Sequence, residues 1–389
     1  MVFVVRLLIL IFLSVAFSGF SQTPVPYKWG EKYGYIDAGT GKVLINPIYD
    51  KVYPFSEGRA LVYRLGKGSF IDATGSIKII LKYDSALSFT EGYSAVKLAG
   101  NWGYMDKLGT LKIPTKFEQA FPFSEGMAVI KKTGKFGYID KAGKEIILPQ
   151  FEYALEFSNG LAVIKKNGKS GYINTTGKLV ITPIYDKAGN FYNGVAVVSL
   201  NNKYGIIDNT GKVSLPVEQD WVSVFNDGLV RVKKGELWGF ANTSGLMLIP
   251  FIYDWVADFQ DGYAKVKKNN KYGYIDKAGT LVIPLDYQWL EDLNADGTLM
   301  AVKSGYWGCI GKENEVIAPF KYKVTRPFSE DLAVVTLGGK YGYLDKKGKL
   351  AIPFLYDYAY DMVNGWAEVV KAERTLFIDR HGNCVKYCE

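Results

Sequence analysis

The sequence has little of the residues that most often carry catalysis or cross-linking. Among 389 residues there are three Cys and one His. Cys309, Cys384 and Cys388 are too few for a disulfide framework, although an oxidising compartment would permit one bridge, and they lack a zinc-site pattern. His381 lies in a turn, where no nucleophile, base and orienting group can be assembled around it. We therefore expect a protein that is not an enzyme, with no catalytic residues, no metal and no cofactor.

Long apolar runs are also lacking after the N-terminus. The run "LLILIFLSVAF" follows Arg6 and precedes small residues of the kind that an export peptidase reads. We expect residues 1–21 to be a cleaved signal peptide. The run is short for a membrane span, and no later stretch is apolar enough to be one. Residues 22–389 are therefore expected to form a single domain that is secreted or periplasmic and has no transmembrane anchor.

What the sequence does contain is one pattern written many times. "KYGYIDKAGTLVIP" at Lys271–Pro284 resembles "KFGYIDKAGKEIILP" at Lys135–Pro149. Alignment on the Gly after the first aromatic residue gives ten units at steps of 34 or 35 residues, and a half unit begins at Arg374. This array leaves no room for a separate catalytic domain. The aligned positions are Gly34, Ser69, Gly103, Gly137, Gly171, Gly205, Gly239, Gly273, Gly308 and Gly342.

Each unit has the pattern of three antiparallel strands. Runs such as "YGYID" and "TLVIP" have the period-two, β-branched character of strands. The D-x-x-G between them, as in Asp140 to Gly143, predicts a three-residue hairpin with a left-handed residue at the Gly; Asn314 takes the Gly position in one unit. A third strand such as "LAVIKK" from Leu161 leads to Asn167-Gly168, which suits a primed two-residue turn. A Pro such as Pro149, after the second strand, is expected to end ladder pairing there.

One unit cannot bury its aromatic face alone, so neighbouring units must stack. We predict an all-β, tandem array of about ten and a half three-stranded units of 34 residues that is open, curved and solenoid-like. A closed, propeller-like ring is the alternative, because the half unit could be completed by the segment "YKW" at Tyr27–Trp29.

The units resemble the WG repeat, a bacterial β-repeat named for its Trp-Gly pair. Trp102-Gly103, Trp238-Gly239 and Trp307-Gly308 match the name, and Tyr or Phe replaces the Trp in other units. The resemblance covers about residues 27–386. The resemblance implies a scaffold, and members of this family mostly have no assigned biochemical activity.

Lysines recur at the ends of the predicted hairpins and would form a row if the units stack. Such a row could attract an anionic partner, but Lys at a hairpin edge also prevents strand-on-strand aggregation, and we favour that explanation. The lysines of this candidate row are Lys132, Lys135, Lys166, Lys169, Lys268 and Lys271.

A sharper signal lies two residues after the aromatic that follows the Pro. One residue per unit at this position, here called the ladder position, gives a polar series and then three consecutive Trp. Stacked indole rings suit sugar rings, cations or peptide aromatics, so Trp221, Trp255, Trp289 and Tyr358 are candidate ligand-binding residues. Wider core packing is the commoner explanation; the binding hypothesis predicts partly exposed rings. The full series is Lys51, Ser85, Gln119, Tyr153, Lys187, Trp221, Trp255, Trp289, Val324 and Tyr358.

Two classes of function follow from these observations. The preferred one is a noncatalytic, monomeric, exported scaffold that binds a protein or polysaccharide partner, with no nucleic acid expected. The alternative is an accessory or hydrolytic enzyme that acts on a surface polymer, which a pocket with two close carboxylates of displaced pKa would favour.

Overall fold

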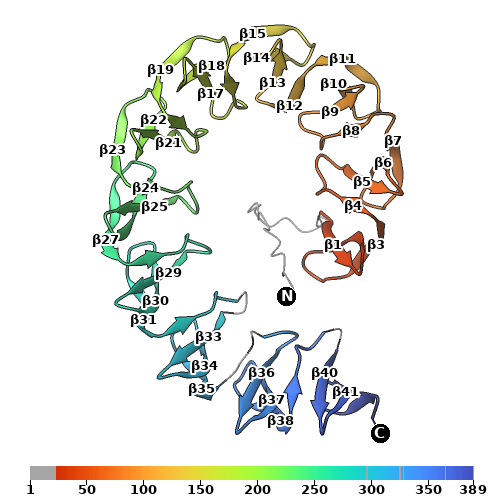
Figure 1. The fold of residues 1–389 in the computed structure, drawn as a ribbon, viewed down its shortest axis with the longest axis vertical. Coiled ribbons are helices and arrows are strands. Elements are labelled where there is room, and N and C mark those ends of the chain that lie inside the picture. Colours follow the sequence, from red (N-terminus) through yellow and green to blue (C-terminus); the bar gives the residue numbers. More distant parts are fainter. Residues whose placement is uncertain (1–22, 295–296, 324–325, 327, 364, 389) are drawn as a thin grey trace, which may run out of the picture. The chain divides into compact units, whose positions relative to one another are not determined.

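The computed structural model describes residues 23–294, 297–323, 326, 328–363 and 365–388. Within these residues the chain is all β: antiparallel strands form eleven sheets in tandem, and none of them closes into a barrel (Figure 1). The predicted all-β repeat array is thereby confirmed. The signal peptide expected at 1–21 lies outside the described residues, and the choice between an open array and a ring stays a prediction.

The strands fall into sheets of three or four neighbours, in chain order. The first five sheets are β1 (Val25–Trp29), β2 (Lys32–Ile36) and β3 (Val43–Tyr49); β4 (Lys51–Val52), β5 (Ala60–Arg64), β6 (Lys67–Ile71) and β7 (Ile77–Ile80); β8 (Ser85–Ala86), β9 (Tyr93–Leu98), β10 (Asn101–Asp106) and β11 (Leu111–Phe117); β12 (Gln119–Ser124), β13 (Met127–Lys132), β14 (Lys135–Asp140) and β15 (Glu145–Phe151); and β16 (Tyr153–Ala154), β17 (Leu161–Lys166), β18 (Lys169–Asn174) and β19 (Leu179–Tyr185). The next six are β20 (Lys187–Ala188), β21 (Val195–Leu200), β22 (Lys203–Asp208) and β23 (Val213–Gln219); β24 (Trp221–Val222), β25 (Leu229–Lys234), β26 (Leu237–Asn242) and β27 (Met247–Tyr253); β28 (Trp255–Val256), β29 (Tyr263–Lys268), β30 (Lys271–Asp276) and β31 (Leu281–Tyr287); β32 (Trp289–Leu290), β33 (Thr298–Lys303), β34 (Tyr306–Gly311) and β35 (Val316–Tyr322); β36 (Leu332–Leu337), β37 (Lys340–Asp345) and β38 (Leu350–Tyr356); and β39 (Tyr358–Ala359), β40 (Trp366–Lys371), β41 (Arg374–Asp379) and β42 (Cys384–Lys386).

The array divides into two compact units. Unit 1 runs to Gly168 and includes Tyr172–Leu179, and unit 2 consists of Lys169–Gly171 and the chain from Val180 onward. The expected single domain over 22–389 stays a prediction.

Each sheet takes its strands from two sequence units. In the second half of a unit a strand such as β17 ends at a tight turn, and the next unit begins with its partner, β18. The turn residues Asn167 and Gly168 have φ of +53° and +73°, which confirms the predicted primed turn. A short strand at the ladder position adds a fourth member to most sheets, so the three strands expected from the pattern are usually four.

The Gly of the repeat lies opposite a bulge. Phe136 pairs with Phe151 and Tyr138 with Ile147, so the strand β15 has two more residues than β14 between the same two pairs. A Cβ on Gly137, between them, would lie 2.5 Å from the carbonyl oxygen of Ile147. The expectation that Pro149 ends ladder pairing is wrong: the strand β15 continues to Phe151, because the bulge accommodates a Pro that has no N–H to donate.

The D-x-x-G turns have the predicted geometry. Gly143, with φ of +80°, donates its N–H to the carbonyl oxygen of Asp140 at 2.9 Å, and the N–H groups of Ala142 and Lys144 donate to the Asp140 carboxylate. Asn314 takes φ of +65° where Gly is missing. The carboxylate oxygen of a turn Asp therefore accepts hydrogen bonds from the backbone N–H groups of its own turn.

The core lies between successive sheets. One cluster combines Tyr138 and Ile147 of the sheet β12–β15 with Phe157, which lies between β16 and β17, and with Ile164 and Ile173 of the sheet β16–β19. These side chains are more than nine-tenths buried. Aromatic burial between sheets is what holds a unit that could not fold alone.

Polar bonds of fixed spacing also join successive sheets. The Ser124 hydroxyl donates to the carbonyl oxygen of Phe157 at 2.8 Å, and the carboxylate of Glu125 accepts the N–H of Gly160 at 2.9 Å. The motif "FSEG" is therefore more than a turn, because its Ser and Glu bind the same motif of the following sheet.

Candidate functional site

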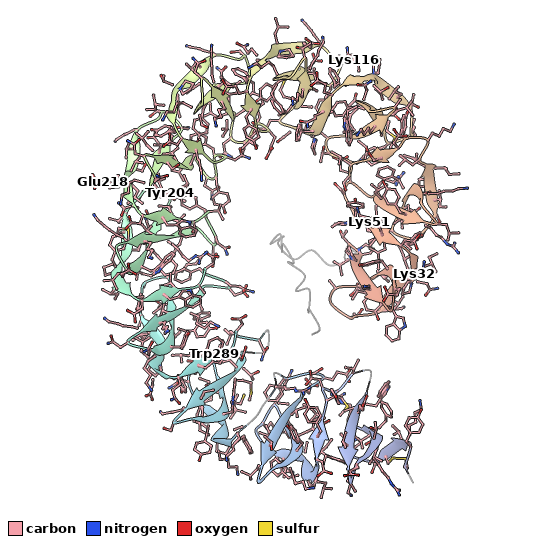
Figure 2. All side chains as sticks on the ribbon, viewed as in Figure 1. Lys32, Lys51, Lys116, Tyr204, Glu218 and Trp289 are labelled. Carbon is pink, nitrogen blue, oxygen red and sulfur yellow. A yellow bond between two sulfur atoms is a disulfide. The ribbon has the colours of Figure 1, made fainter. Side chains whose placement is uncertain are left out.

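The ladder position begins the short first strand of a sheet. Trp221 begins β24, Trp255 begins β28, Trp289 begins β32 and Tyr358 begins β39. The residues Trp255 and Trp289 are 39% and 42% exposed, and Trp221 and Tyr358 are half-buried. The predicted partial exposure is confirmed, so these rings are not sealed in the core. Glu218 and Trp289 lie on opposite sides of the stack of sheets in unit 2 (Figure 2).

The strand register explains which residues accompany each Trp. Trp255 pairs with Lys267, Lys267 with Tyr272, and Tyr272 with Tyr287, in a row across the sheet β28–β31. Directly opposed residues of antiparallel strands share a face, so these four side chains are neighbours. The preceding sheet repeats the arrangement as Trp221, Lys233, Trp238 and Tyr253.

The rings continue from one sheet to the next through the aromatic residue of the Trp-Gly motif. The ring centroid of Tyr272 lies 6.4 Å from that of Trp255 in its own sheet and 5.3 Å from that of Trp289 in the next, both edge-on. Trp221 and Trp238 are 5.5 Å apart in the same manner. Sequence reasoning missed these motif aromatics as part of the ladder, although Trp221 and Trp238 are half a repeat apart, which would have been a usable signal.

Two cations next to the ladder were also missed. The Arg231 guanidinium lies 5.2 Å from the Trp221 ring centroid and 2.5 Å from the carboxylate of Asp258 in the following sheet. The largely buried Lys265 lies 5.8 Å from the Trp289 ring centroid, forms an ion pair with Asp292 at 2.8 Å and donates to the carbonyl oxygen of Leu290 at 3.1 Å. The signal was a charged residue at a position where four other units have Val, namely Val129, Val163, Val197 and Val334.

The polar atoms of two ladder residues are already bonded. The indole N–H of Trp289 donates to the Glu291 carboxylate at 2.9 Å. The Arg326 guanidinium donates to the Tyr358 hydroxyl at 2.6 Å and lies 5.4 Å from its ring centroid. What these residues offer to a ligand is therefore mainly their ring surface.

The six lysines of the predicted row differ in whether their ammonium groups already have a bonded partner. Lys132 pairs with Glu145 at 2.6 Å, Lys169 pairs with Asp186 at 2.5 Å, and Lys271 donates to the carbonyl oxygen of Asp286 at 3.2 Å. Among the described residues no ion pair is formed by the other three, which are Lys135, Lys166 and Lys268. The ammonium groups of three of the six lysines therefore already bind acceptors within the protein.

The carboxylates have structural roles. The hydrogen bond from Lys78 is the largest of the influences that hold the pKa of Asp72 far below its usual range, followed by that from Thr74. Among the described residues, every carboxyl with a shifted pKa is shifted downward, and no group of three or more His, Cys, Asp and Glu side chains could hold a metal ion. The backbone N–H of His381 donates to Asp379 at 2.9 Å, within the last turn.

Cys384 and Cys388 form a disulfide with 5.6 Å between their Cα atoms, and Cys309 is buried. The part of the chain that the structure describes has no helix that could cross a membrane.

Comparison with known proteins identifies the repeat. The family described as "WG containing repeat" matches ten consecutive segments: 33–67, 69–102, 102–136, 136–169, 171–204, 204–238, 238–272, 272–306, 307–341 and 341–373. A comparison with curated proteins finds no match.

Solved structures of low similarity also match. A eukaryotic initiation factor shares 10% identity with a TM-score of 0.47, over 76% of this chain and 95% of its own. The dihydro-heme d1 dehydrogenase NirN, solved in complex with DHE, shares 13% identity with a TM-score of 0.38. The match covers 77% of this chain and 73% of that one. PorZ, a surface component of the type-IX secretion system of Porphyromonas gingivalis, shares 8% identity with a TM-score of 0.28. The match covers 92% of this chain and 72% of that one. At these identities and TM-scores we draw no conclusion about this chain from the three structures.

Proposed function

The chain belongs to the WG repeat family, and on this premise we propose that it is a noncatalytic, exported scaffold that binds a protein or glycan partner. The binding surface is the aromatic ladder of unit 2, here defined as Trp221, Trp238, Trp255, Tyr272 and Trp289. Export is proposed from the N-terminal apolar run.

The observation that carries the proposal is the contiguity of Trp255, Tyr272 and Trp289. Their rings contact one another across two sheets, and the two Trp remain about two-fifths exposed. Large aromatic surface left in water is costly, and exposed apolar patches commonly mark interaction sites. Trp and Tyr are the residues most enriched at the energetic centres of interfaces. Among the described residues, no pair of close carboxylates with raised pKa supports the alternative of a hydrolytic enzyme.

The experiment compares the wild type with a variant that carries Trp221→Ser, Trp255→Ser and Trp289→Ser. We expect the variant to lose its signals on a glycan array and in a pull-down, with a melting temperature close to that of the wild type. Fully buried Trp would instead cost about 3–5 kcal/mol each on truncation. A collapsed melting temperature, or unchanged binding, would contradict the proposal.

The matched control removes an exposed aromatic elsewhere. Tyr153 occupies the ladder position in the sheet β16–β19 and is 47% exposed, but the ladder position of the following sheet is Lys187. Tyr153→Ser should therefore leave binding unchanged.

A further inference from the structure

The lysines that lie within the aromatic ladder differ from the other cations beside it. Lys233 lies 5.7 Å from the Trp238 ring centroid, and Lys267 lies 5.5 Å from that of Tyr272. Each is directly opposite a ladder Trp, which is Trp221 for Lys233 and Trp255 for Lys267. Each sheet thus presents one ammonium group between two aromatic side chains.

These two ammonium groups have weak or no carboxylate partners. Lys233 is 4.0 Å from Glu236, whose side chain is 98% exposed. Its charge also helps to lower the pKa of Asp220, but that carboxylate is already paired with Lys203 at 2.5 Å. Lys267 forms no ion pair among the described residues. Arg231 and Lys265, in contrast, are held by Asp258 and Asp292. Among these four cations beside the ladder rings, the positive charge available to a ligand therefore comes from Lys233 and Lys267.

The spacing of these charges indicates the kind of polymer that would fit. Stacked sheets pack about 10 Å apart, so one Lys per sheet gives widely spaced cations. Each strand of a DNA duplex carries a phosphate about every 3.4 Å of helix axis, which would leave most of its charges without a partner here. A polysaccharide with one carboxylate in each disaccharide has much sparser charges. Its pyranose rings also present flat C–H faces, which suit aromatic rings.

We propose that the surface formed by Trp221, Lys233, Trp238, Trp255, Lys267, Tyr272 and Trp289 binds an acidic polysaccharide. Pyranose rings lie against the exposed faces of Trp255 and Trp289, and uronate carboxylates pair with Lys233 and Lys267. This inference rests on the proposed function, because it takes the same ladder as the binding surface, and it narrows the partner to a carboxylated glycan.

The test measures the affinity of the purified protein for four probes: hyaluronan oligosaccharides, unsulfated chondroitin oligosaccharides, carboxyl-reduced hyaluronan and an oligo-dT strand. We expect the wild type to bind at least one of the uronate probes, and to bind it more weakly as salt rises. The double variant Lys233→Gln/Lys267→Gln should raise the Kd for that probe about tenfold, the size of a typical interface contact. Carboxyl-reduced hyaluronan should bind the wild type no better than the variant binds the acidic probe.

The chain offers a matched control in unit 1. Lys97 and Lys131 lie 5.9 and 5.5 Å from the ring centroids of Trp102 and Phe136, but they pair across the sheet with Ser85 and Gln119 in place of Trp. Lys97→Gln/Lys131→Gln makes the same charge change and should leave the Kd unchanged. Lys233→Arg/Lys267→Arg keeps the charge and should retain binding, which tests the inference even if the Gln variant folds poorly.

Four results would overturn the inference. Equal weakening by the control variant would mean a nonspecific charge effect, and tighter binding of oligo-dT would identify a nucleic-acid surface. Equal affinity for hyaluronan and carboxyl-reduced hyaluronan would mean that the surface binds glycans but does not require their carboxylates. Failure to bind either uronate probe, in a protein whose Trp-dependent pull-down signal persists, would reject the polysaccharide and keep the proposed scaffold.

Discussion

The hydroxyl of Tyr138 donates a hydrogen bond to the carbonyl oxygen of Leu155 at 2.8 Å, and this bond joins the sheet β12–β15 to the sheet β16–β19. Tyr138 is fully buried, and the partner lies 17 residues further along the chain. The same bond, at distances of 2.7 to 3.1 Å, is made by Tyr35 to Tyr53, Tyr104 to Phe121, Tyr274 to Glu291 and Tyr343 to Tyr360. The second aromatic of the repeat therefore both fills the core and fixes the offset between neighbouring sheets.

Removing this hydroxyl should destabilise the protein without disturbing the packing. Tyr138→Phe leaves the Leu155 carbonyl without its partner, which should cost about 1–3 kcal/mol. The ring itself should fit, because Phe70 and Phe240 occupy the equivalent position and are fully buried. The free energy of unfolding from urea titration measures the effect. Tyr153→Phe, on an exposed ring, is the control, and equal effects of the two changes would refute the role of the bond.

The same tyrosines predict a loss of stability at alkaline pH. Burial is the largest cause that raises the pKa of Tyr138 above its ordinary value of 10.0, and it raises the pKa of Tyr104 in the same way. The unfolded state therefore releases these protons first, so their contribution to stability is complete below pH 10 and falls as the pH rises beyond it. Melting temperatures measured at pH 8 to 11, about one unit apart, should drop only in the upper part of this range. A drop that Tyr138→Phe leaves unchanged would count against this assignment.

The motif Gly should tolerate no side chain. A Cβ at position 137 would lie 2.5 Å from the Ile147 oxygen and 2.7 Å from the Pro149 nitrogen, both of them backbone atoms that cannot turn aside. Gly137→Ala should thus open the bulge and cost more than about 1–3 kcal/mol, the usual effect of overpacking. Thermal melts should show a smaller effect for Gly126→Ala, where nothing lies within 4 Å of the added Cβ and only the φ of +79° is strained. The reverse order would mean that the bulge adapts easily.

Local features were readable from the sequence because the residue type determines them directly. Asn167 and Gly168 indicate positive φ, and Asp140 with Gly143 indicates a turn, whatever surrounds them. The role of Pro149 was misread because a Pro normally ends pairing, and only the partner strand shows that Gly137 leaves room for a bulge. The strand β24 was missed because two residues, Trp221 and Val222, are too few for any periodicity to appear.

The candidate site was readable only in part for a related reason. The 34-residue spacing identified Trp221, Trp255 and Trp289, because a repeat places equivalent residues at equivalent points. It could not show that Tyr272 lies between two of them, since that contact joins residues of different repeat positions. The ion pair of Lys265 with Asp292 likewise crosses between sheets, 27 residues apart, and no local pattern encodes it.

Cross-sheet contacts of fixed spacing predict how deletions will behave. Removing Lys135–Gly168, which is 34 residues, joins Gly134 to Lys169 and lets the strand β13 pair with β18 in the register that β14 had. The bonds from the Tyr104 hydroxyl to the carbonyl oxygen of Phe121 and from the Ser56 hydroxyl to that of Phe89 are unaffected, because both partners precede the deletion. The shortened protein should therefore still melt cooperatively. Removing 135–151, about half a repeat, takes away β14 and β15, so the strand β13 loses its partner and its sheet keeps only β12 and β13. Circular dichroism of the two deletion variants checks this, and a half-repeat deletion that melts as sharply as the full one would show that the register does not hold the array together.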